Sequence, residues 1–342
     1  MKKFVNDPAQ FVPEFMKGIA LANPDLLEFT PEFQMIVRKS GPSNSKVSIV
    51  QGSGSGHEPA HVMAVGPGML TGACQGAVFA APPVDACYET IKACNSDAGV
   101  LVLVNNYQGD RMAWDMATEM AQAEGINVRQ FWINDDVAVE DSLYTVGRRG
   151  VAGNFFVFKV AGAACDRGMT LDECEAVTRK ANDRTYTVGV ALESCSMPQT
   201  RRHNFEIGPE DMELGMGIHG EPGVSRERIR TADEIVDTIM DTIFREMKAE
   251  AGDRVAVLVN SFGATPQMEL YILFRRVEQR LTAKNIVIEA NWVGHYCTSL
   301  DMVGASISIL HLDRQLTELL HHPCQSALLT INAQTTDGSA HG

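Results

Sequence analysis

The segment GVLVLVN, residues 99–105, places five consecutive Val and Leu residues between a glycine and an asparagine. A short strand that is apolar at each position is typical of a parallel sheet covered on both faces. Apolar residues at helical spacing precede it over 84–94 and follow it over 112–124, and further strands are expected at 47–50 (VSIV) and 126–134 (INVRQFWIN). This alternation predicts a doubly wound α/β unit, in which ligands lie at the carboxyl ends of the strands.

A second group of strands begins near residue 187. The chain has 342 residues, which suggests about two domains at roughly 100–200 residues each. We predict a doubly wound three-layer α/β/α domain with a parallel sheet over residues 1–185, followed by a two-layer α/β domain with a mixed sheet over residues 186–335. The elements expected in the second domain are strands at 187–195, 254–263, 285–293 and 305–312 and helices at 231–249, 266–282 and 313–321.

Composition excludes several classes of protein. The 29 Lys and Arg residues against 43 Asp and Glu give a net charge of −14, which disfavours non-specific binding to nucleic acid or anionic lipid. The eight cysteines include no Cys-x-x-Cys pair, so we expect reduced, mostly buried thiols and no zinc site. No apolar run approaches the roughly 20 residues of a membrane span, and Asp7 and Pro8 interrupt any secretion signal. The expected location is the cytoplasm.

The loop QGSGSGHEP (51–59) directly follows the strand expected at 47–50. Three known glycine fingerprints fail there. The dinucleotide pattern would need glycine where the chain has His57, the Walker pattern would need a lysine that is absent from 47–91, and a nucleophile elbow would need serine in place of Gly54. What remains is a bare backbone whose N–H groups can surround a small ligand beside an imidazole. A tight turn with a purely structural histidine is the alternative.

A second histidine lies among glycines at His219, within LGMGIHGEPG (214–223), and Asp110 follows another strand end. A neutral imidazole can attack a carbonyl carbon and a carboxylate can take a proton from an alcohol, so the three residues suit chemistry on a small hydroxy-ketone. On chemistry alone, a free-standing lyase or isomerase remains an alternative. A metal pair of His57 and His61 is disfavoured by the intervening Pro59 and the lack of a third ligand.

Seven motifs, taken together and in order, resemble the substrate-binding K subunit of the dihydroxyacetone kinases, the DhaK-like family. The resemblance runs through nearly the whole chain. The motifs are SGSGHEPAH (53–61), GMLTGACQG (68–76), NNYQGDR (105–111), DDVAVEDSLYTVGRRGVAG (135–153), GMGIHGEPG (215–223), NSFGATP (260–266) and YCTSLDMVG (296–304).

The resemblance implies a role for each site residue. His219 adds its ring nitrogen to the ketose carbonyl as a hemiaminal, Asp110 acts as the base on the accepting hydroxyl, and His57 hydrogen-bonds the sugar. These three are the implied catalytic residues. The implied substrate-binding residues are Gly54, Ser55, Gly56, His57, Asn105, Asp110 and His219, and no metal is expected.

The resemblance also implies partners. The chain is expected to form a homodimer, to carry no cofactor, and to act with a separate L subunit that holds ADP or ATP with Mg. The phosphoryl donor is a phosphotransferase-system protein or ATP. No nucleic acid or membrane partner is expected.

Two positions depart from the family pattern, which usually has lysine at Asn105 and glycine at Ser53. Loss of the lysine removes a charge-assisted hydrogen bond, worth roughly 1.5–3 kcal/mol. The shorter Asn105 alternatively makes room for a four-carbon ketose such as erythrulose. A ketose-binding sensor or coactivator without kinase activity is the other alternative.

Overall fold

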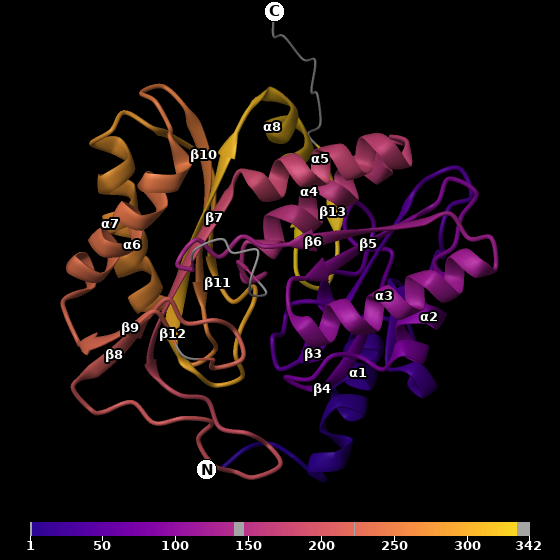
Figure 1. The fold of residues 1–342 in the computed structure, drawn as a ribbon, viewed down its shortest axis with the longest axis horizontal. Coiled ribbons are helices and arrows are strands. Elements are labelled where there is room, and N and C mark those ends of the chain that lie inside the picture. The colour runs from indigo at the N-terminus through magenta and orange to yellow at the C-terminus, as the bar shows by residue number, and fades with distance from the viewer. Residues whose placement is uncertain (1, 140–146, 222, 334–342) are drawn as a thin grey trace, which may run out of the picture.

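The computed structural model describes residues 2–139, 147–221 and 223–333, which contain two six-stranded sheets and eight α-helices (Figure 1). Part of the predicted motif at 135–153, Pro222 of the second histidine loop and the expected end of the second domain at 334–335 lie outside the described residues. The predicted boundary near residue 185 coincides with the start of the second sheet and stays a prediction.

The first sheet combines four parallel strands with an antiparallel hairpin at one edge. The strands β3, β4, β5 and β6 are parallel to one another, as predicted for this sheet, and β2 joins β4 antiparallel. In spatial order they are β1 (Leu27–Thr30), β2 (Met35–Arg38), β4 (Gly72–Val78), β3 (Ser48–Ser55), β5 (Val100–Asn105) and β6 (Val128–Ile133).

The second sheet is mixed, as predicted: β10 and β11 are parallel, and the remaining pairs are antiparallel. In spatial order its strands are β11 (Val287–Gly294), β10 (Arg254–Ser261), β12 (Val303–Leu312), β7 (Thr185–Glu193), β8 (Asp211–Leu214) and β9 (Ser225–Arg228). A short hairpin of β13 (Cys324–Gln325) and β14 (Thr330–Ile331) follows.

The helices form layers around the two sheets (Figure 1). The helices α2 and α3 share an apolar cluster with one face of the first sheet, and α6 and α7 share another with the second sheet. The α-helices are α1 (Phe11–Ala22), α2 (Val84–Ala93), α3 (Gln108–Ala123), α4 (Asn154–Asp166), α5 (Leu171–Asp183), α6 (Ala232–Met247), α7 (Gln267–Thr282) and α8 (Arg314–Leu320). Short 3₁₀ turns are η1 (Pro8–Gln10), η2 (Pro31–Phe33) and η3 (Val62–Ala64).

Helix α4 lies between the two sheets. Its residues from Asn154 to Cys165 are all buried, because its sequence is apolar around nearly the whole circumference. Phe155 contacts Trp292 of the second sheet, with ring centroids 5.2 Å apart. On the other side, a Cβ on Gly162 would lie 2.5 Å from the Cα of Met69, so only glycine permits this approach. The helix thereby ties the two sheets into one core.

The predicted strands and helices are present, with ends mostly within a few residues of those expected. The strands that were not predicted lack the sequence pattern of a strand, for reasons that can be identified. Strand β4 reads GACQGAV, which has a single branched residue, Val78, and lacks the alternation that indicates a strand. The hairpin β1–β2 and the pair β8–β9 consist of four-residue strands with little pattern. These segments become strands because neighbouring backbones satisfy their hydrogen bonds.

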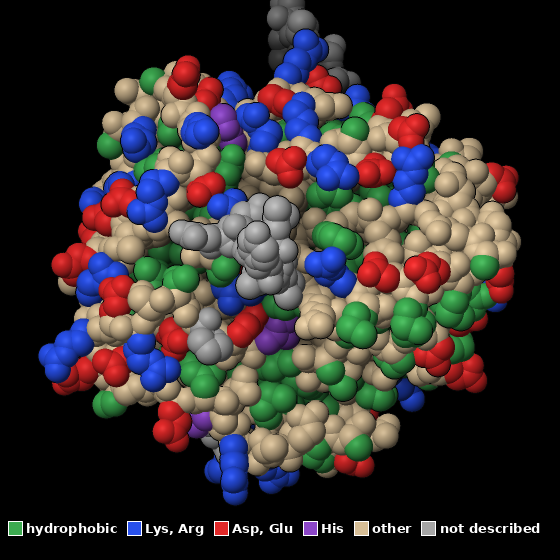
Figure 2. All heavy atoms as spheres, viewed as in Figure 1, with side chains coloured by type: hydrophobic (Ala, Val, Ile, Leu, Met, Phe, Trp, Pro, Cys, Tyr) green, Lys and Arg blue, Asp and Glu red, His purple; other side chains and the backbone are tan. Residues whose placement is uncertain are grey.

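Acidic and basic side chains intermingle on the face shown in Figure 2, and hydrophobic side chains gather over α3. Met112, Met116 and Met120 of that helix are 59%, 54% and 44% exposed. All eight cysteines are buried and unpaired, as predicted. Within the described ranges, no helix combines the length and apolarity needed to cross a bilayer.

Candidate functional site

The two histidine loops predicted from the sequence meet in space. His57 follows the carboxyl end of β3, and His219 lies in the loop between β8 and β9. Their ring centroids are 4.6 Å apart at an interplanar angle of 81°. Tyr107, which precedes α3, places its ring centroid 4.4 Å from that of His219. Strand ends of both sheets therefore contribute to one site.

His57 is held as a neutral hydrogen-bond acceptor. Its Nδ1 donates to the carbonyl oxygen of Thr298 at 2.9 Å, because a carbonyl can only accept. Burial, followed by the charges of His219 and His61, lowers the pKa of His57 well below its ordinary value. Nε2 is buried and has no hydrogen-bond partner among the described residues. This nitrogen therefore presents a lone pair that a ligand hydroxyl can donate to.

Asp110 lies in the first turn of α3 and is only 3% exposed. The hydroxyl of Ser53 donates to Oδ2 at 2.8 Å, whereas Oδ1 is buried with no partner in the described part of the chain. Burial raises the pKa of Asp110 to about 6, against the opposing effects of the Ser53 hydrogen bond and His219. A carboxylate with such a pKa is suited to accept a proton near neutral pH.

Glu221 holds the loop around His219. Its Oε2 accepts the backbone N–H of His219 at 2.8 Å, and its Oε1 lies 3.6 Å from Nδ1 of the ring. Burial raises the pKa of Glu221, but His219 and then Arg149 outweigh it and bring the value to about 2. A carboxylate facing Nδ1 favours the tautomer with its hydrogen there and its lone pair on Nε2. The ring of His219 is thus arranged as a nucleophile.

The predicted loop at 51–59 is wrong in its first half, because β3 continues to Ser55 and only the residues after it form a loop. The glycines of this segment are required because backbone passes close to it. A Cβ on Gly54 would lie 2.7 Å from the amide nitrogen of Ala80, and Gly56 has a φ of +98°. The hydroxyl of Ser55 donates to the carbonyl oxygen of Gly76. Gly54, Ser55 and Gly56 therefore lie beside His57 as expected, but the Ser55 hydroxyl is already occupied by the protein's own backbone.

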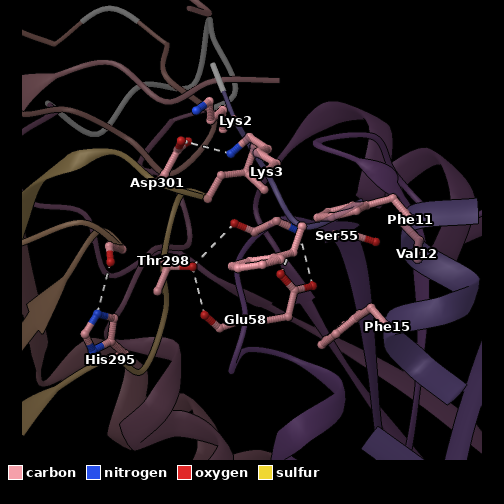
Figure 3. A pocket seen from close by; sticks show the side chains of 14 residues that line it. Lys2, Lys3, Phe11, Val12, Phe15, Ser55, Glu58, His295, Thr298 and Asp301 are labelled. Carbon is pink, nitrogen blue, oxygen red and sulfur yellow. Dashed lines mark hydrogen bonds and ion pairs between the residues drawn. The ribbon is translucent and has the colours of Figure 1, made fainter. Parts of the chain in front are cut away.

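A cavity of about 570 Å³ adjoins the same loop (Figure 3). Ser55, Gly56 and Glu58 contribute to its lining, together with Phe11 and Phe15 of α1. The carboxylate of Glu58 accepts from the amide of Gly56 at 3.0 Å, and burial raises its pKa to about 7. His57, His219 and Asp110 are not among the residues that line this cavity.

Asn105 is the last residue of β5 and is fully buried. A Cβ on Gly150 would lie 3.0 Å from its Cα, so the backbone packs closely against it. The parallel register of β3 and β5 pairs Gln51 with Leu103, two residues before Asn105. Both atoms of the Asn105 amide lack a hydrogen-bond partner within the described residues.

Sequence reasoning missed several residues of the site. Phe79 stacks on His57 with centroids 5.3 Å apart, and Tyr107 contacts His219. Thr298 supplies the carbonyl that fixes the His57 tautomer. Tyr107 and Thr298 lie inside quoted motifs, so the motifs flagged these segments, although long-range pairing gives no signal in one sequence.

His61 lies near the site without forming a metal pair. Its ring centroid is 6.1 Å from that of His57, and burial lowers its pKa to about 3. Among the described residues, no group of three or more His, Cys, Asp or Glu side chains is placed to hold a metal ion.

Comparison with known proteins places the chain in a family. Residues 17–328 match the Dak1 domain. The chain belongs to the DhaK family of dihydroxyacetone kinase subunits. It is 43% identical to the dihydroxyacetone-binding subunit DhaK of the PTS-dependent dihydroxyacetone kinase of Lactococcus lactis, over 91% of this chain and 94% of that protein.

Two further DhaK-family relatives bear on specificity. An L-erythrulose 1-kinase of Mycolicibacterium smegmatis is 38% identical over 95% of this chain, which matches 57% of that protein. A solved structure described as a dihydroxyacetone kinase operon co-activator has a TM-score of 0.88 and 32% identity, covering 93% of this chain and 98% of that one. The family thus includes kinases for two sugars and a regulatory protein.

Proposed function

We propose that this chain is the substrate-binding subunit of a two-component kinase for dihydroxyacetone or a closely related short ketose. The observation that carries the proposal is the contact between the His57 and His219 rings, whose centroids lie 4.6 Å apart. The free nitrogen of His57 and the free oxygen of Asp110 support it, because both are buried acceptors that a polyhydroxy ligand would satisfy. The 43% identity to a dihydroxyacetone-binding subunit supports the sugar class.

In the first step, Nε2 of His219 attacks the carbonyl carbon of the ketose. The C=O π electrons move to the oxygen, which takes up a proton, while Nδ1 gives up its proton, so that the resulting hemiaminal is neutral. Glu221, whose oxygen lies 3.6 Å from Nδ1, is positioned to receive that proton or pass it on. A polyol such as glycerol has no carbonyl to attack, so the covalent step selects ketones and aldehydes against polyols.

In the second step, Asp110 accepts the proton of a ketose hydroxyl, the hydroxyl oxygen would attack the γ-phosphorus of ATP, and the bond from that phosphorus to the bridging oxygen would break so that ADP leaves. We place that nucleotide, ADP or ATP with Mg, on a separate L-type subunit, and we place no cofactor on this chain. ATP, or a phosphotransferase-system protein that recharges the L subunit, supplies the phosphoryl group. The working unit is a homodimer in the cytoplasm.

Reconstitution tests this proposal. The purified chain, an L-type partner and its phosphoryl donor are incubated with three- to five-carbon ketoses and with glycerol as the matched polyol. We expect ketose phosphate only when all components are present, and no product from glycerol. Absence of product from each ketose would show that the kinase assignment is wrong.

Two other functions have specific support. The co-activator structure favours a ketose sensor, which would bind ketose in calorimetry yet support no phosphoryl transfer with any L partner. The L-erythrulose kinase and the buried Asn105 favour a four-carbon substrate, for which kcat/KM with erythrulose would exceed that with dihydroxyacetone.

A further inference from the structure

Ser53 contacts the carboxylate that the proposed mechanism uses, although no role was assigned to it. It is fully buried on β3, and its hydroxyl donates to Oδ2 of Asp110 at 2.8 Å. The register of β3 against β4 shifts between Ser53 and Ser55. Such irregularities re-aim side chains at the ends of strands. The hydroxyl of Ser53 therefore reaches Asp110 in the first turn of α3.

We infer that Ser53 is a positioning residue for phosphoryl transfer, which occupies Oδ2 of Asp110 and leaves Oδ1 as the single oxygen that accepts the substrate proton. The inference rests on the proposed role of Asp110 as the base. A hydrogen bond to one oxygen fixes the rotation of the carboxylate about its terminal bond. Oδ1, which is buried and has no partner in the described structure, then faces a defined direction. Glycine at this position would leave both oxygens free to rotate.

The same hydrogen bond sets the proton affinity of the base. Burial raises the pKa of Asp110 to about 6, and the Ser53 hydrogen bond opposes that rise by stabilising the charged form. The other titratable groups that interact with Asp110 come from two elements: Cys87 of α2 and His219 between β8 and β9. Burial raises the pKa of Cys87, so this residue remains a neutral thiol. Ser53 and His219 are thus the groups that lower the pKa of Asp110.

The test uses the reconstituted kinase and compares Ser53→Ala and Ser53→Gly with wild type. Since the carboxylate must be ionised to act as a base, kcat falls on the acid side of the pKa of Asp110. Without the hydroxyl, that pKa rises, so the acid limb of the kcat profile moves upward by roughly 0.5–1 pH unit. Ser48→Ala is the matched control, because Ser48 is buried on the same strand with its hydroxyl unpaired within the described residues.

A second measurement needs no partner subunit. Titration of the Asp110 carboxyl carbon by NMR in the isolated chain, assigned with Asp110→Asn, reports its pKa directly. The inference is supported if the pKa of Asp110 is raised in both Ser53 variants and unchanged from wild type in Ser48→Ala. An unchanged titration of Asp110 and an unmoved acid limb would overturn it.

The outcome also separates this inference from the proposed function. If Asp110→Asn transfers phosphoryl groups at the wild-type rate, the role of Asp110 as base is wrong, whatever the Ser53 variants do. If Asp110→Asn is inactive while Ser53→Ala keeps the wild-type acid limb, the proposed function stands and the role of Ser53 fails.

Discussion

His57 and His219 differ in which ring nitrogen the protein engages and in what engages it. His57 donates from Nδ1 to a backbone carbonyl in a fully buried position, whereas Nδ1 of His219 faces the carboxylate of Glu221. A neutral carbonyl leaves Nε2 of His57 as a passive acceptor, whereas a carboxylate facing Nδ1 of His219 favours the tautomer whose lone pair is on Nε2. This difference supports the proposal that the first ring recognises the sugar and the second attacks its carbonyl carbon.

Glu221→Gln tests the charged neighbour. The amide keeps the shape of the side chain but removes the negative charge facing Nδ1. We expect ketose affinity to fall about 3- to 30-fold, which is less than for a direct charge-assisted hydrogen bond because Oε1 lies 3.6 Å from Nδ1. Calorimetry with dihydroxyacetone gives the affinity. Glu210→Gln, at a carboxylate that is 72% exposed, is the control and leaves affinity unchanged. Equal affinities for wild type and Glu221→Gln would remove Glu221 from the mechanism.

Asn105→Lys tests the departure from the family pattern. A lysine at the end of β5 would add a cation at the strand end where we place the bound ketose. We expect dihydroxyacetone to bind about tenfold more tightly, because the cation adds a charge-assisted hydrogen bond. We expect the kcat/KM for erythrulose to fall relative to that for dihydroxyacetone, because the longer side chain fills space that the larger sugar needs. Relative kcat/KM for the two sugars is the readout, with the exposed Asn95→Lys as control. A preference that does not change would show that residue 105 does not determine the sugar.

The site was predictable from sequence only as far as local motifs reach. Glycines around His57 and His219 and the strand end before Asp110 indicated a site before any contact was known. The partners that set their chemistry, Thr298 for His57 and Ser53 for Asp110, come from other strands. A hydrogen bond between distant segments leaves no pattern in a single sequence.

Helix α4 illustrates how a buried element carries a charge. Lys159 is fully buried, and its Nζ donates to the carbonyl oxygen of Leu319 at the end of α8 at 2.9 Å. A cation at a helix C-terminus is favourable, but burial lowers the pKa of Lys159 to about 8 from its ordinary 10.5. The unfolded chain therefore holds a proton between pH 8 and 10.5 that the native protein lacks.

Lys159→Met follows from this difference in proton binding. The free energy of unfolding of the wild type increases as the pH rises from about 8 to 10.5, because native Lys159 is then neutral and no buried charge opposes folding. The variant lacks this gain, so its stability relative to wild type falls by about 1–3 kcal/mol between pH 7.5 and 10.5. Urea unfolding at both pH values measures it, with the exposed Lys17→Met as control. A constant difference across this range would contradict the prediction.

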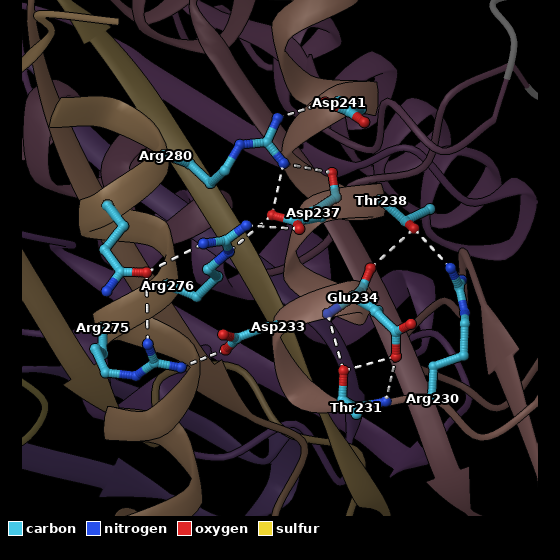
Figure 4. A network of polar contacts seen from close by, with 11 residues as sticks. Arg230, Thr231, Asp233, Glu234, Asp237, Thr238, Asp241, Arg275, Arg276 and Arg280 are labelled. Carbon is cyan, nitrogen blue, oxygen red and sulfur yellow. Dashed lines mark hydrogen bonds and ion pairs between the residues drawn. The ribbon is translucent and has the colours of Figure 1, made fainter. Parts of the chain in front are cut away.

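Helices α6 and α7 are joined by a network of carboxylates and guanidinium groups (Figure 4). Asp237 accepts from Arg276 at 2.9 and 2.8 Å and from Arg280 at 2.7 Å. These bonds, Arg276 first, lower the pKa of Asp237 to about 2. The carboxylate is 33% exposed, so solvent screens much of the attraction.

Asp237→Asn is expected to destabilise the protein by about 1 kcal/mol at neutral pH and low salt, and by less at high salt. Because the native pKa is depressed, the contribution is complete above the ordinary value of 3.8 and is lost as the pH falls toward 2. Chemical unfolding at pH 7 and pH 3 in low and high salt measures it. The exposed Asp97→Asn serves as control, and equal losses at all four conditions would argue against an ionic contribution.

At the scale of the whole molecule, apolar patterns predicted the two sheets and most of their helices. Runs such as Val100–Asn105 and Arg254–Ser261 indicate buried strands because Val, Leu and Ala fill most of their positions. Strand β4 was not predicted, because its glycines and alanines are selected by close neighbouring segments, and the sequence does not reveal which segments lie close. The packing of both sheets against α4, which brings the histidine loops together, likewise depends on contacts between segments far apart in the chain.

The covalent link between His219 and the ketose is the central claim. NMR of the chain with ¹⁵N-labelled histidine and dihydroxyacetone labelled with ¹³C at the carbonyl carbon tests it most directly. We predict a one-bond coupling between that carbon and a ring nitrogen, which is absent in His219→Gln. A saturated complex in which the bound carbon shows no coupling to any imidazole nitrogen would contradict it.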